Sequence, residues 1–402
     1  MSLDLSIRNI TVFVTEKCNF SCSYCFQRER KNPKSMNWDT GKKLLDWYIN
    51  TASENEKVLS FTFFGGEPLL EFQLIKQMVK YGNAKAEKAG KKIEFGATTN
   101  GSLFNQEVAA FWKENNMSLL LSVDGGEQSQ NLQRISNNGK KSSELIEKNI
   151  PYILEAVPDC TVRMTVTQEN QKHIVENLNY LYDKGFRSLA HYPVEAGWDD
   201  ESLANLDKAY RAAANWYLKK LSLGEKVFMG LYSLIGRRLI EWNAMSDNEK
   251  QEVKAPCGAG KGYLGVSVDG KLFPCHRFVS LNDFKGRFLL GDIESGFNTK
   301  LRNQFVRITN KSSLGCHTSC QYCEARSICL GGCLVQNLMT SGDMLIPMPA
   351  QQFISTMYYE TVKDIIELLE SRNKKLLQKF LGNNVFESSE KGRESNIVME
   401  PC

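Results

Sequence analysis

Three cysteines near the N-terminus form the most reactive pattern in the sequence. Cys18, Cys22 and Cys25 stand as C-x-x-x-C-x-x-C, directly after the β-branched segment Ile10 to Thr15, which predicts a strand. The thiols therefore lie on a loop at a strand's C-terminal end, where α/β folds place their chemistry. Three thiolates can hold three irons of a 4Fe–4S cluster and leave the fourth iron open for another ligand. The alternative is a structural zinc loop with a fourth ligand elsewhere, although zinc sites usually use C-x-x-C pairs.

The cysteine pattern resembles the signature of the radical S-adenosylmethionine (radical SAM) superfamily, in which an aromatic residue, here Tyr24, precedes the third cysteine. The resemblance implies that the open iron binds the amine and carboxylate of S-adenosylmethionine. It also implies reductive cleavage to methionine and a 5′-deoxyadenosyl radical, which takes a hydrogen atom from the substrate. The protein then binds, orients and shields the cofactors and the substrate, while the cofactors carry the chemistry.

The composition is that of a globular protein with more than one domain. The chain has 402 residues, of which 42% are hydrophobic and 10% aromatic, enough for a substantial core. The net charge of +4 is too small to argue for nucleic-acid or membrane binding. No apolar run approaches membrane-spanning length, and residues 1–8 are not a signal peptide. We therefore expect a cytoplasmic protein whose twelve cysteines bind metal rather than form disulfides.

Strand-like and helix-like segments alternate over the first half of the chain. The predicted strands are Asn9–Thr15, Val58–Phe64, Ile93–Thr99, Ser118–Val123, Thr161–Thr167 and Arg187–Pro193. The predicted helices between them are Asn37–Ala52, Leu69–Ala89, Gln106–Asn115, Ser142–Ala156 and Glu169–Lys184. Strands joined by crossover helices indicate an α/β fold with a parallel sheet. The resemblance narrows this to a partial (β/α)6 TIM-like barrel, which spacing alone does not separate from an open doubly wound sheet.

The rest of the chain divides into segments of different character. Helices are predicted at Glu201–Gly224, Val227–Ser246 and Gln351–Leu381. The predicted domains are a barrel (1–200), a helical bridge (201–254), a cysteine-rich domain (255–350), a C-terminal helix (351–381) and a flexible polar tail (382–402).

A second candidate site follows the second predicted strand as Gly65-Gly66-Glu67-Pro68. The glycines let the backbone approach a ligand closely, Glu67 offers a carboxylate to a cation, and Pro68 suits the first turn of a helix. An ordinary strand-to-helix turn could use the same residues. The resemblance implies that this run binds the methionine amino group of S-adenosylmethionine.

Polar residues end the third and fourth predicted strands as well. Asn100 follows the third strand, and Ser122 and Asp124 stand at the end of the fourth. The resemblance implies that these three contact the ribose or methionyl part of the cofactor. Arg134, in the next loop, is a candidate for a carboxylate or substrate contact. Helix capping or a turn is the alternative role for all four.

The remaining cysteines cluster in the second half of the chain. One pair has the spacing C-x12-G-x4-C and another set has the spacing C-x2-C-x5-C-x3-C. These cysteines are Cys257 and Cys275, around Gly270, and Cys320, Cys323, Cys329 and Cys333. The pattern resembles the SPASM domain, which holds up to two auxiliary 4Fe–4S clusters in radical SAM enzymes that modify peptides. A zinc ribbon is the alternative.

The cysteine count departs from the SPASM pattern at its end. The pattern has one more cysteine beyond the C-x3-C, but none lies between Met339 and Asn396. Cys316 can take the vacant place. The segment then supplies seven of eight ligands, so one cluster keeps an open iron, which we favour, or Cys402 closes it. By position, we expect Cys257, Cys275 and Cys333 at the inner cluster, and Cys316, Cys320, Cys323 and Cys329 at the outer one.

The residue after the second SPASM cysteine is also unusual. In the sulfatase-maturating branch it is normally an Asp, a proposed base, whereas here the sequence is Pro274-Cys275-His276-Arg277-Phe278. Imidazole can accept a proton near neutral pH, which makes His276 a candidate catalytic residue. The alternative is a surface histidine beside a cluster. The sequence from Cys275 to Phe278 looks more like that of the branch that makes thioether crosslinks in peptides and in an amine dehydrogenase subunit.

The resemblance thus implies a SPASM-domain radical SAM oxidoreductase that modifies a ribosomally made peptide or protein, with a thioether crosslink as the expected bond. The alternatives are formylglycine formation in a sulfatase, carbon–carbon crosslinking or epimerisation of a peptide, and a non-catalytic iron–sulfur or zinc scaffold. The expected partners are the precursor peptide and a reductant of the flavodoxin or ferredoxin type. Because about eight residues precede the first strand, a separate protein, the barrel or the SPASM domain must read the leader sequence.

Overall fold

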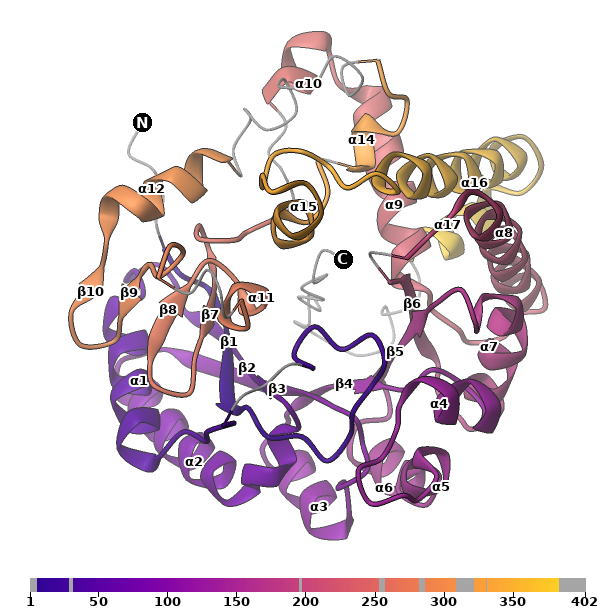
Figure 1. The fold of residues 1–402 in the computed structure, drawn as a ribbon. Coiled ribbons are helices and arrows are strands. Elements are labelled where there is room, and N and C mark those ends of the chain that lie inside the picture. Colours follow the sequence, from indigo (N-terminus) through magenta and orange to yellow (C-terminus); the bar gives the residue numbers. More distant parts are fainter. Residues whose placement is uncertain are drawn as a thin grey trace. The chain divides into compact units, whose positions relative to one another are not determined.

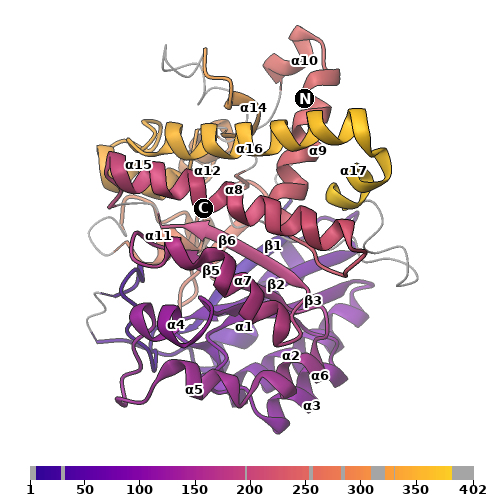
Figure 2. The same ribbon diagram turned by 90° about the vertical axis from the view of Figure 1, so that its right-hand side faces the viewer.

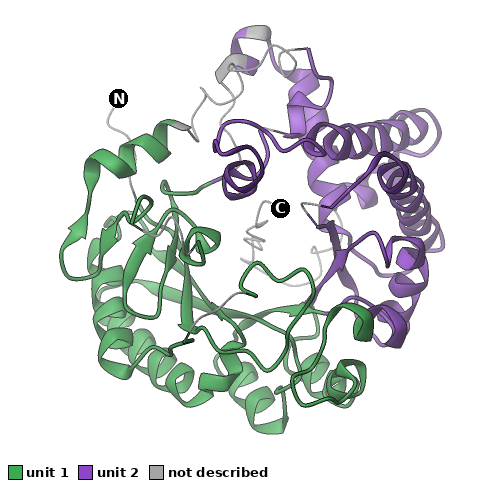
Figure 3. Ribbon diagram, in the orientation of Figure 1, with its two compact units in different colours: residues 1–122, 130–160, 258–309 green, residues 123–129, 161–257, 310–402 purple. Residues whose placement is uncertain are grey.

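The computed structural model describes residues 6–28, 32–194, 197–252, 257–281, 286–308, 322–329 and 331–382. The chain forms two compact units, which Figure 3 shows in different colours. Unit 1 comprises residues 1–122, 130–160 and 258–309, and unit 2 comprises residues 123–129, 161–257 and 310–402. The domain limits expected from the sequence stay a prediction.

Unit 1 is built on a sheet with the strand order β10-β9-β8-β7-β1-β2-β3-β4 (Figure 1). Its parallel part consists of β1 (Asn9–Thr15), β2 (Val58–Gly65), β3 (Lys92–Thr99) and β4 (Ser118–Ser122). The helices of unit 1 that follow these strands are α1 (Trp38–Thr51), the 3₁₀ helix η1 (Pro68–Glu71), α2 (Phe72–Lys88), α3 (Gln106–Glu114), α5 (Ser142–Glu147) and α6 (Ile150–Ala156). Helix α4 (Glu127–Gln133) crosses the boundary between the units.

The sheet of unit 1 is covered by amphipathic helices. Helix α1 begins where the Asn37 side chain accepts a hydrogen bond from the Thr40 amide at 2.8 Å, the expected N-cap. Its apolar face buries Leu44, Leu45 and Tyr48, and burial of this kind stabilises the fold by roughly 25 cal/mol per Å² of apolar surface. The strands contribute aromatic side chains to the same core.

A second segment of the chain extends this sheet on the free edge of β1. Strand β7 (Tyr263–Val266) pairs with β1 in parallel, with Asn9 opposite Tyr263. The following elements of this extension are β8 (Lys271–Phe273), α11 (His276–Val279), β9 (Gly291–Asp292), β10 (Gly296–Phe297) and α12 (Thr299–Ile308). The segment that carries Cys275 therefore belongs to the same compact unit as the cysteine loop after β1.

Unit 2 contains the parallel pair β5 (Thr161–Val166) and β6 (Ser188–Pro193) and a set of helices. These are η2 (Gln171–His173), α7 (Ile174–Asp183), α8 (Asp200–Ser222), α9 (Gly230–Ala244), α10 (Asp247–Glu252), α14 (Arg326–Cys329), α15 (Leu334–Ser341), α16 (Gln351–Arg372) and α17 (Lys374–Phe380). Helices α8 and α16, both long, lie side by side in unit 2 (Figure 2).

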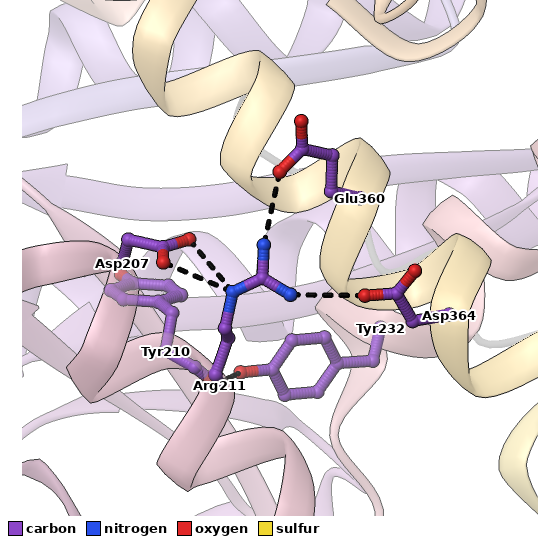
Figure 4. A network of polar contacts seen from close by, with 6 residues as sticks. All are labelled: Asp207, Tyr210, Arg211, Tyr232, Glu360 and Asp364. Carbon is purple, nitrogen blue, oxygen red and sulfur yellow. Dashed lines mark hydrogen bonds and ion pairs between the residues drawn. The ribbon is translucent and has the colours of Figure 1, made fainter. Parts of the chain in front are cut away.

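A charge network joins these two helices (Figure 4). Arg211 on α8 pairs with Asp207 on its own helix and reaches Glu360 and Asp364 on α16, each at 3.0 Å. Close to this network, the Tyr232 hydroxyl of α9 donates to the Tyr210 carbonyl at 2.9 Å. One guanidinium thus serves three carboxylates, which its fork of five donors allows.

The six predicted strands are confirmed to within one residue at each end. Two predicted helices are broken in the structure. Ser142–Ala156 divides into α5 and α6 because Pro151 stands in the first turn of a new helix. Gln351–Leu381 divides at Asn373, whose side chain caps α17 by accepting from the Leu376 amide. No helix among the described residues has the length and apolar character needed to cross a membrane.

Candidate active site

The cysteine loop begins at the end of β1 and is bonded to the turn that ends β2. The Gly66 amide donates to the Thr15 carbonyl, and the Glu67 amide donates to the Lys17 carbonyl, both at 2.9 Å. Gly65 has φ +139°, and a Cβ there would lie 2.0 Å from the Thr15 oxygen. Only glycine allows this approach. The Gly-Gly-Glu-Pro run therefore lies directly against the start of the loop.

The other side of the loop pairs with the end of α4 and the residues that follow it. The amides of Ser21 and Ser23 donate to the carbonyls of Ile135 and Gln133 at 2.7 and 2.9 Å. The side chain of Asn137 donates to the Cys18 carbonyl at 3.1 Å. These bonds fix the backbone of the loop from outside, and no motif in the sequence predicts them.

Two predicted site residues meet at this edge. The Arg134 guanidinium carbon lies 5.4 Å from the centre of the Tyr24 ring, a cation–π distance. Arg134 is 5% exposed, so its charge lies within the protein beside the cysteine loop.

Glu67 links the ends of β2 and β3. Its Oε1 accepts from the Leu69 amide at 3.1 Å and the Thr99 hydroxyl at 2.7 Å, and its Oε2 accepts from the Asn100 amide at 2.8 Å. The side chain is fully buried. Burial raises the pKa of Glu67 to about 7, against the opposing effect of the three hydrogen bonds. The carboxyl group thus joins the loops that follow β2 and β3 through three hydrogen bonds.

Asn100 joins the third strand to the cysteine loop. Its Nδ2 donates to Asn19 Oδ1 at 2.9 Å, and its Oδ1 accepts from the Ser102 hydroxyl at 2.6 Å. Asn19 in turn donates to Ser102 at 2.8 Å. Asn19 and Ser102 were missed by sequence reasoning, although Asn19 directly follows Cys18.

The remaining three predicted site residues stand at or just after the ends of β2 and β4 in the sequence, and they do not all belong to one unit. Ser122 ends β4 in unit 1 and is half-buried. Asp124 belongs to unit 2, where it is buried and accepts from the Thr165 amide at 2.9 Å. Pro68 opens η1 in unit 1.

His276 lies inside unit 1, so the alternative of a surface histidine is wrong. It is 3% exposed and begins α11, directly after Cys275. Its Nδ1 is 2.6 Å from the Tyr263 hydroxyl. Its ring packs edge-on against Phe26 and Phe64, at centroid distances of 6.0 and 5.2 Å.

The cysteines expected to bind auxiliary clusters are distributed over both units. Cys275 is in unit 1, and the others that the structure describes are in unit 2, where Cys333 is buried and Cys257, Cys323 and Cys329 are half-buried. Cys316, Cys320 and Cys402 lie outside the described residues. Cys160 is buried, and its thiol donates to the Leu119 carbonyl. Burial raises the pKa of this thiol, in keeping with a structural role.

The loop with Cys18, Cys22 and Cys25 fits a 4Fe–4S cluster. All three residues are half-buried on one short loop, and the Phe20 amide donates to the Cys18 sulfur at 3.4 Å, as amides do around cluster thiolates. Within the described ranges, no three His, Cys, Asp or Glu side chains converge as the ligands of a single metal ion would. A cluster does not require this because each cysteine binds its own iron.

The fold and the loop together define a class of protein: an α/β protein with a three-cysteine loop after its first strand. Residues 12–181 match the family model of the Radical SAM superfamily. Residues 12–181 are therefore a radical SAM domain, a class of domain whose cofactors are a 4Fe–4S iron–sulfur cluster and S-adenosylmethionine.

Two known proteins are similar in sequence to this chain. The chain is 33% identical over 186 residues to an uncharacterised protein, MJ0907, of Methanocaldococcus jannaschii, covering 46% of this chain and 62% of that one, less than two thirds of its length. It is 24% identical over 340 residues to a cysteine-type anaerobic sulfatase-maturating enzyme of Clostridium perfringens, covering 79% and 85%.

A solved structure, native anSMEcpe with bound AdoMet and Cp18Cys peptide, has a TM-score of 0.71 at 19% identity. The match covers 93% of this chain and 99% of that one. It confirms the predicted α/β fold.

Proposed function

We propose that this enzyme modifies a ribosomally made peptide or protein and forms a thioether bond between a cysteine sulfur and a carbon of the substrate. The observation that carries the substrate class is the similarity over 79% of the chain to a sulfatase-maturating enzyme, whose substrate is a protein by its name. When bound, the cluster and S-adenosylmethionine supply a radical that removes a hydrogen atom from carbon.

The residues of this chain would hold and shield that chemistry. Cys18, Cys22 and Cys25 would bind the cluster. The turn around Gly66 and the buried pair of Glu67 with Asn100 would form the wall for the cofactor, because hydrogen bonds tie them to the cysteine loop.

A thioether requires removal of one hydrogen atom, one electron and the thiol proton as the C–S bond forms. The predicted auxiliary clusters would accept the electron. The seven-cysteine count leaves an open iron that could bind the substrate thiolate and lower the pKa of its thiol. Proton release to solvent or a base balances the reaction.

The second candidate is formylglycine formation, which the sulfatase-maturating relative favours. His276 weakens it, because a buried imidazole bonded to Tyr263 stands where that branch has an acid. We further propose a reductant of the flavodoxin or ferredoxin type and a cytoplasmic location, with the leader of the precursor bound by the barrel, the SPASM domain or a separate leader-binding protein.

The test is the product formed from a cysteine-containing precursor encoded beside the gene. A thioether makes the peptide lighter by two hydrogens and leaves one thiol unreactive toward an alkylating reagent. A carbon–carbon crosslink gives the same mass with every thiol reactive, epimerisation gives no mass change, and formylglycine from cysteine loses the sulfur. Each of these three results contradicts the thioether.

A further inference from the structure

Tyr263 and His276 form a buried polar pair at the edge of β1. The Tyr263 hydroxyl donates to Thr11 Oγ1 at 2.9 Å. The same hydroxyl lies 2.6 Å from His276 Nδ1, a hydrogen-bond distance. The imidazole is thus bonded to Tyr263 of β7 and linked to Thr11 of β1 through the Tyr263 hydroxyl, and its Nδ1 is occupied.

The backbone beside His276 is held just as closely. A Cβ on Gly265 of β7 would lie 2.4 Å from the Cys275 carbonyl oxygen and 2.6 Å from the His276 nitrogen. The glycine therefore leaves the space in which the Cys275–His276 backbone crosses β7. Because Gly265 is opposite Thr11 in the sheet, the crossing lies next to β1, the strand that leads into the cysteine loop.

The ring of His276 faces one residue next to the cysteine loop and one next to the Gly-Gly-Glu-Pro run, the two parts of the predicted cofactor site. Phe26 directly follows Cys25, and Phe64 directly precedes Gly65. Both rings are edge-on to the imidazole, the arrangement that aromatic rings prefer. The Arg277 guanidinium adds a cation–π contact to Phe26 at 5.7 Å. The first part of the cysteine loop has hydrogen bonds to residues 133–137. Phe26 follows that part, next to Gln27, whose side chain donates to the Gly65 carbonyl at 2.9 Å.

We propose that His276 is a positioning residue that, held by Tyr263, fixes Phe26 and with it Cys25 relative to Cys275. The proposal rests on the proposed function in taking Cys18, Cys22 and Cys25 as the ligands of the cluster that binds S-adenosylmethionine. It gives His276 a role distinct from that of a base: it sets the geometry of the N-terminal cluster from a segment about 250 residues away in sequence.

The test uses anaerobically purified full-length enzyme and the variants His276→Ala, His276→Phe and Tyr263→Phe. The matched control is Tyr48→Phe, which removes two hydrogen bonds of a buried side chain in unit 1 but touches neither cysteine segment. The readouts are iron content, the change that S-adenosylmethionine causes in the electron paramagnetic resonance spectrum of the reduced enzyme, the rate of 5′-deoxyadenosine formation, and the mass of the product formed from the precursor peptide. The spectral change isolates the cluster that binds the cofactor.

His276→Ala should keep its iron, show an altered spectral change, and cleave S-adenosylmethionine roughly 10-fold more slowly or worse. His276→Phe retains a ring against Phe26 and should recover part of both losses. Tyr263→Phe should show an intermediate defect, and Tyr48→Phe should match wild type.

Two results would overturn the proposal. A His276→Ala enzyme with wild-type spectrum and cleavage but no peptide product would place the role of His276 after cleavage, as expected of a base, and not in positioning the cluster. A His276→Ala enzyme equal to Tyr48→Phe in every readout would show that His276 has no positioning role. Absence of any spectral response to S-adenosylmethionine in wild type would instead contradict the proposed function, and the inference with it.

Discussion

The Oε2 atom of Glu67 accepts a hydrogen bond from the Asn100 amide at 2.8 Å, so a fully buried carboxylate joins the ends of β2 and β3. Asn100 passes this link on to Asn19 of the cysteine loop, 81 residues earlier in the chain. Three separate segments are thereby fixed as one wall. Rigid support of this kind is what a cofactor site needs.

The first prediction follows from the pKa of Glu67, which burial raises from 4.5 to about 7. Folding favours the protonated form of Glu67. The contribution of this group to the free energy of unfolding is therefore fully present below pH 4.5 and is lost as the pH rises through 7. Between about pH 6 and 8 we expect the free energy of unfolding to fall by about 1 kcal/mol from this group.

Denaturant titrations of wild type and Glu67→Gln at both pH values measure this effect. Glu67→Gln should lose that part of the pH dependence, and Glu107→Gln, at an exposed pair on α3, should keep it. An equal slope in all three proteins would contradict the account of Glu67.

The second prediction concerns Gly65. Gly65→Ala places a methyl group 2.0 Å from the Thr15 oxygen at φ +139°, so the cysteine loop and the β2 turn must separate. We expect a loss of more than about 2 kcal/mol in unfolding free energy together with loss of the N-terminal cluster, measured by denaturation and iron content.

Gly90→Ala is the matched control, because Gly90 also has a positive φ, +64°, but no atom within 4 Å of the added methyl. It should lower stability by about 1 kcal/mol from backbone strain alone and keep all its iron. If both variants behave alike, the close approach at Gly65 has no special importance.

The third prediction concerns the network around Arg211. Arg211→Met leaves three carboxylates of α8 and α16 without their shared cation. Because the side chain is 36% exposed, solvent screens the network, and we expect a loss of only about 1 kcal/mol. The loss should shrink at high salt; a salt-independent loss would indicate packing rather than charge.

The fourth prediction tests how the auxiliary clusters are completed. Removing residues 383–402 deletes Cys402 but keeps the hydrogen bond from the Ser233 hydroxyl to the Leu381 carbonyl at 2.7 Å. If Cys316 is the sufficient ligand or an iron stays open, the shortened enzyme keeps its full iron content. Loss of one cluster's iron would assign Cys402 as a ligand.

Local sequence was sufficient for the strands. Runs such as Ile10 to Thr15 are β-branched and apolar, and their burial on a parallel sheet needs no other information. The helix breaks at Pro151 and Asn373 were missed because the apolar periodicity continues across both, while the proline and the cap act locally.

Long-range relations could not be predicted from the sequence. The pairing of β7 with β1 joins two strands about 250 residues apart, and the hydrophobic periodicity of neither strand predicts its partner. The burial of His276 follows from that pairing. The cysteine spacing indicated chemistry, but only the folded arrangement shows that Glu67 is closed to solvent.

The central claim is that Cys18, Cys22 and Cys25 hold the cluster that cleaves S-adenosylmethionine. The most direct measurement is 5′-deoxyadenosine formation by wild type and by the triple variant Cys18→Ala, Cys22→Ala, Cys25→Ala under reducing, anoxic conditions. Wild type should form it, and the triple variant should form none while keeping the iron of its auxiliary clusters. A triple variant that still forms 5′-deoxyadenosine would contradict the claim.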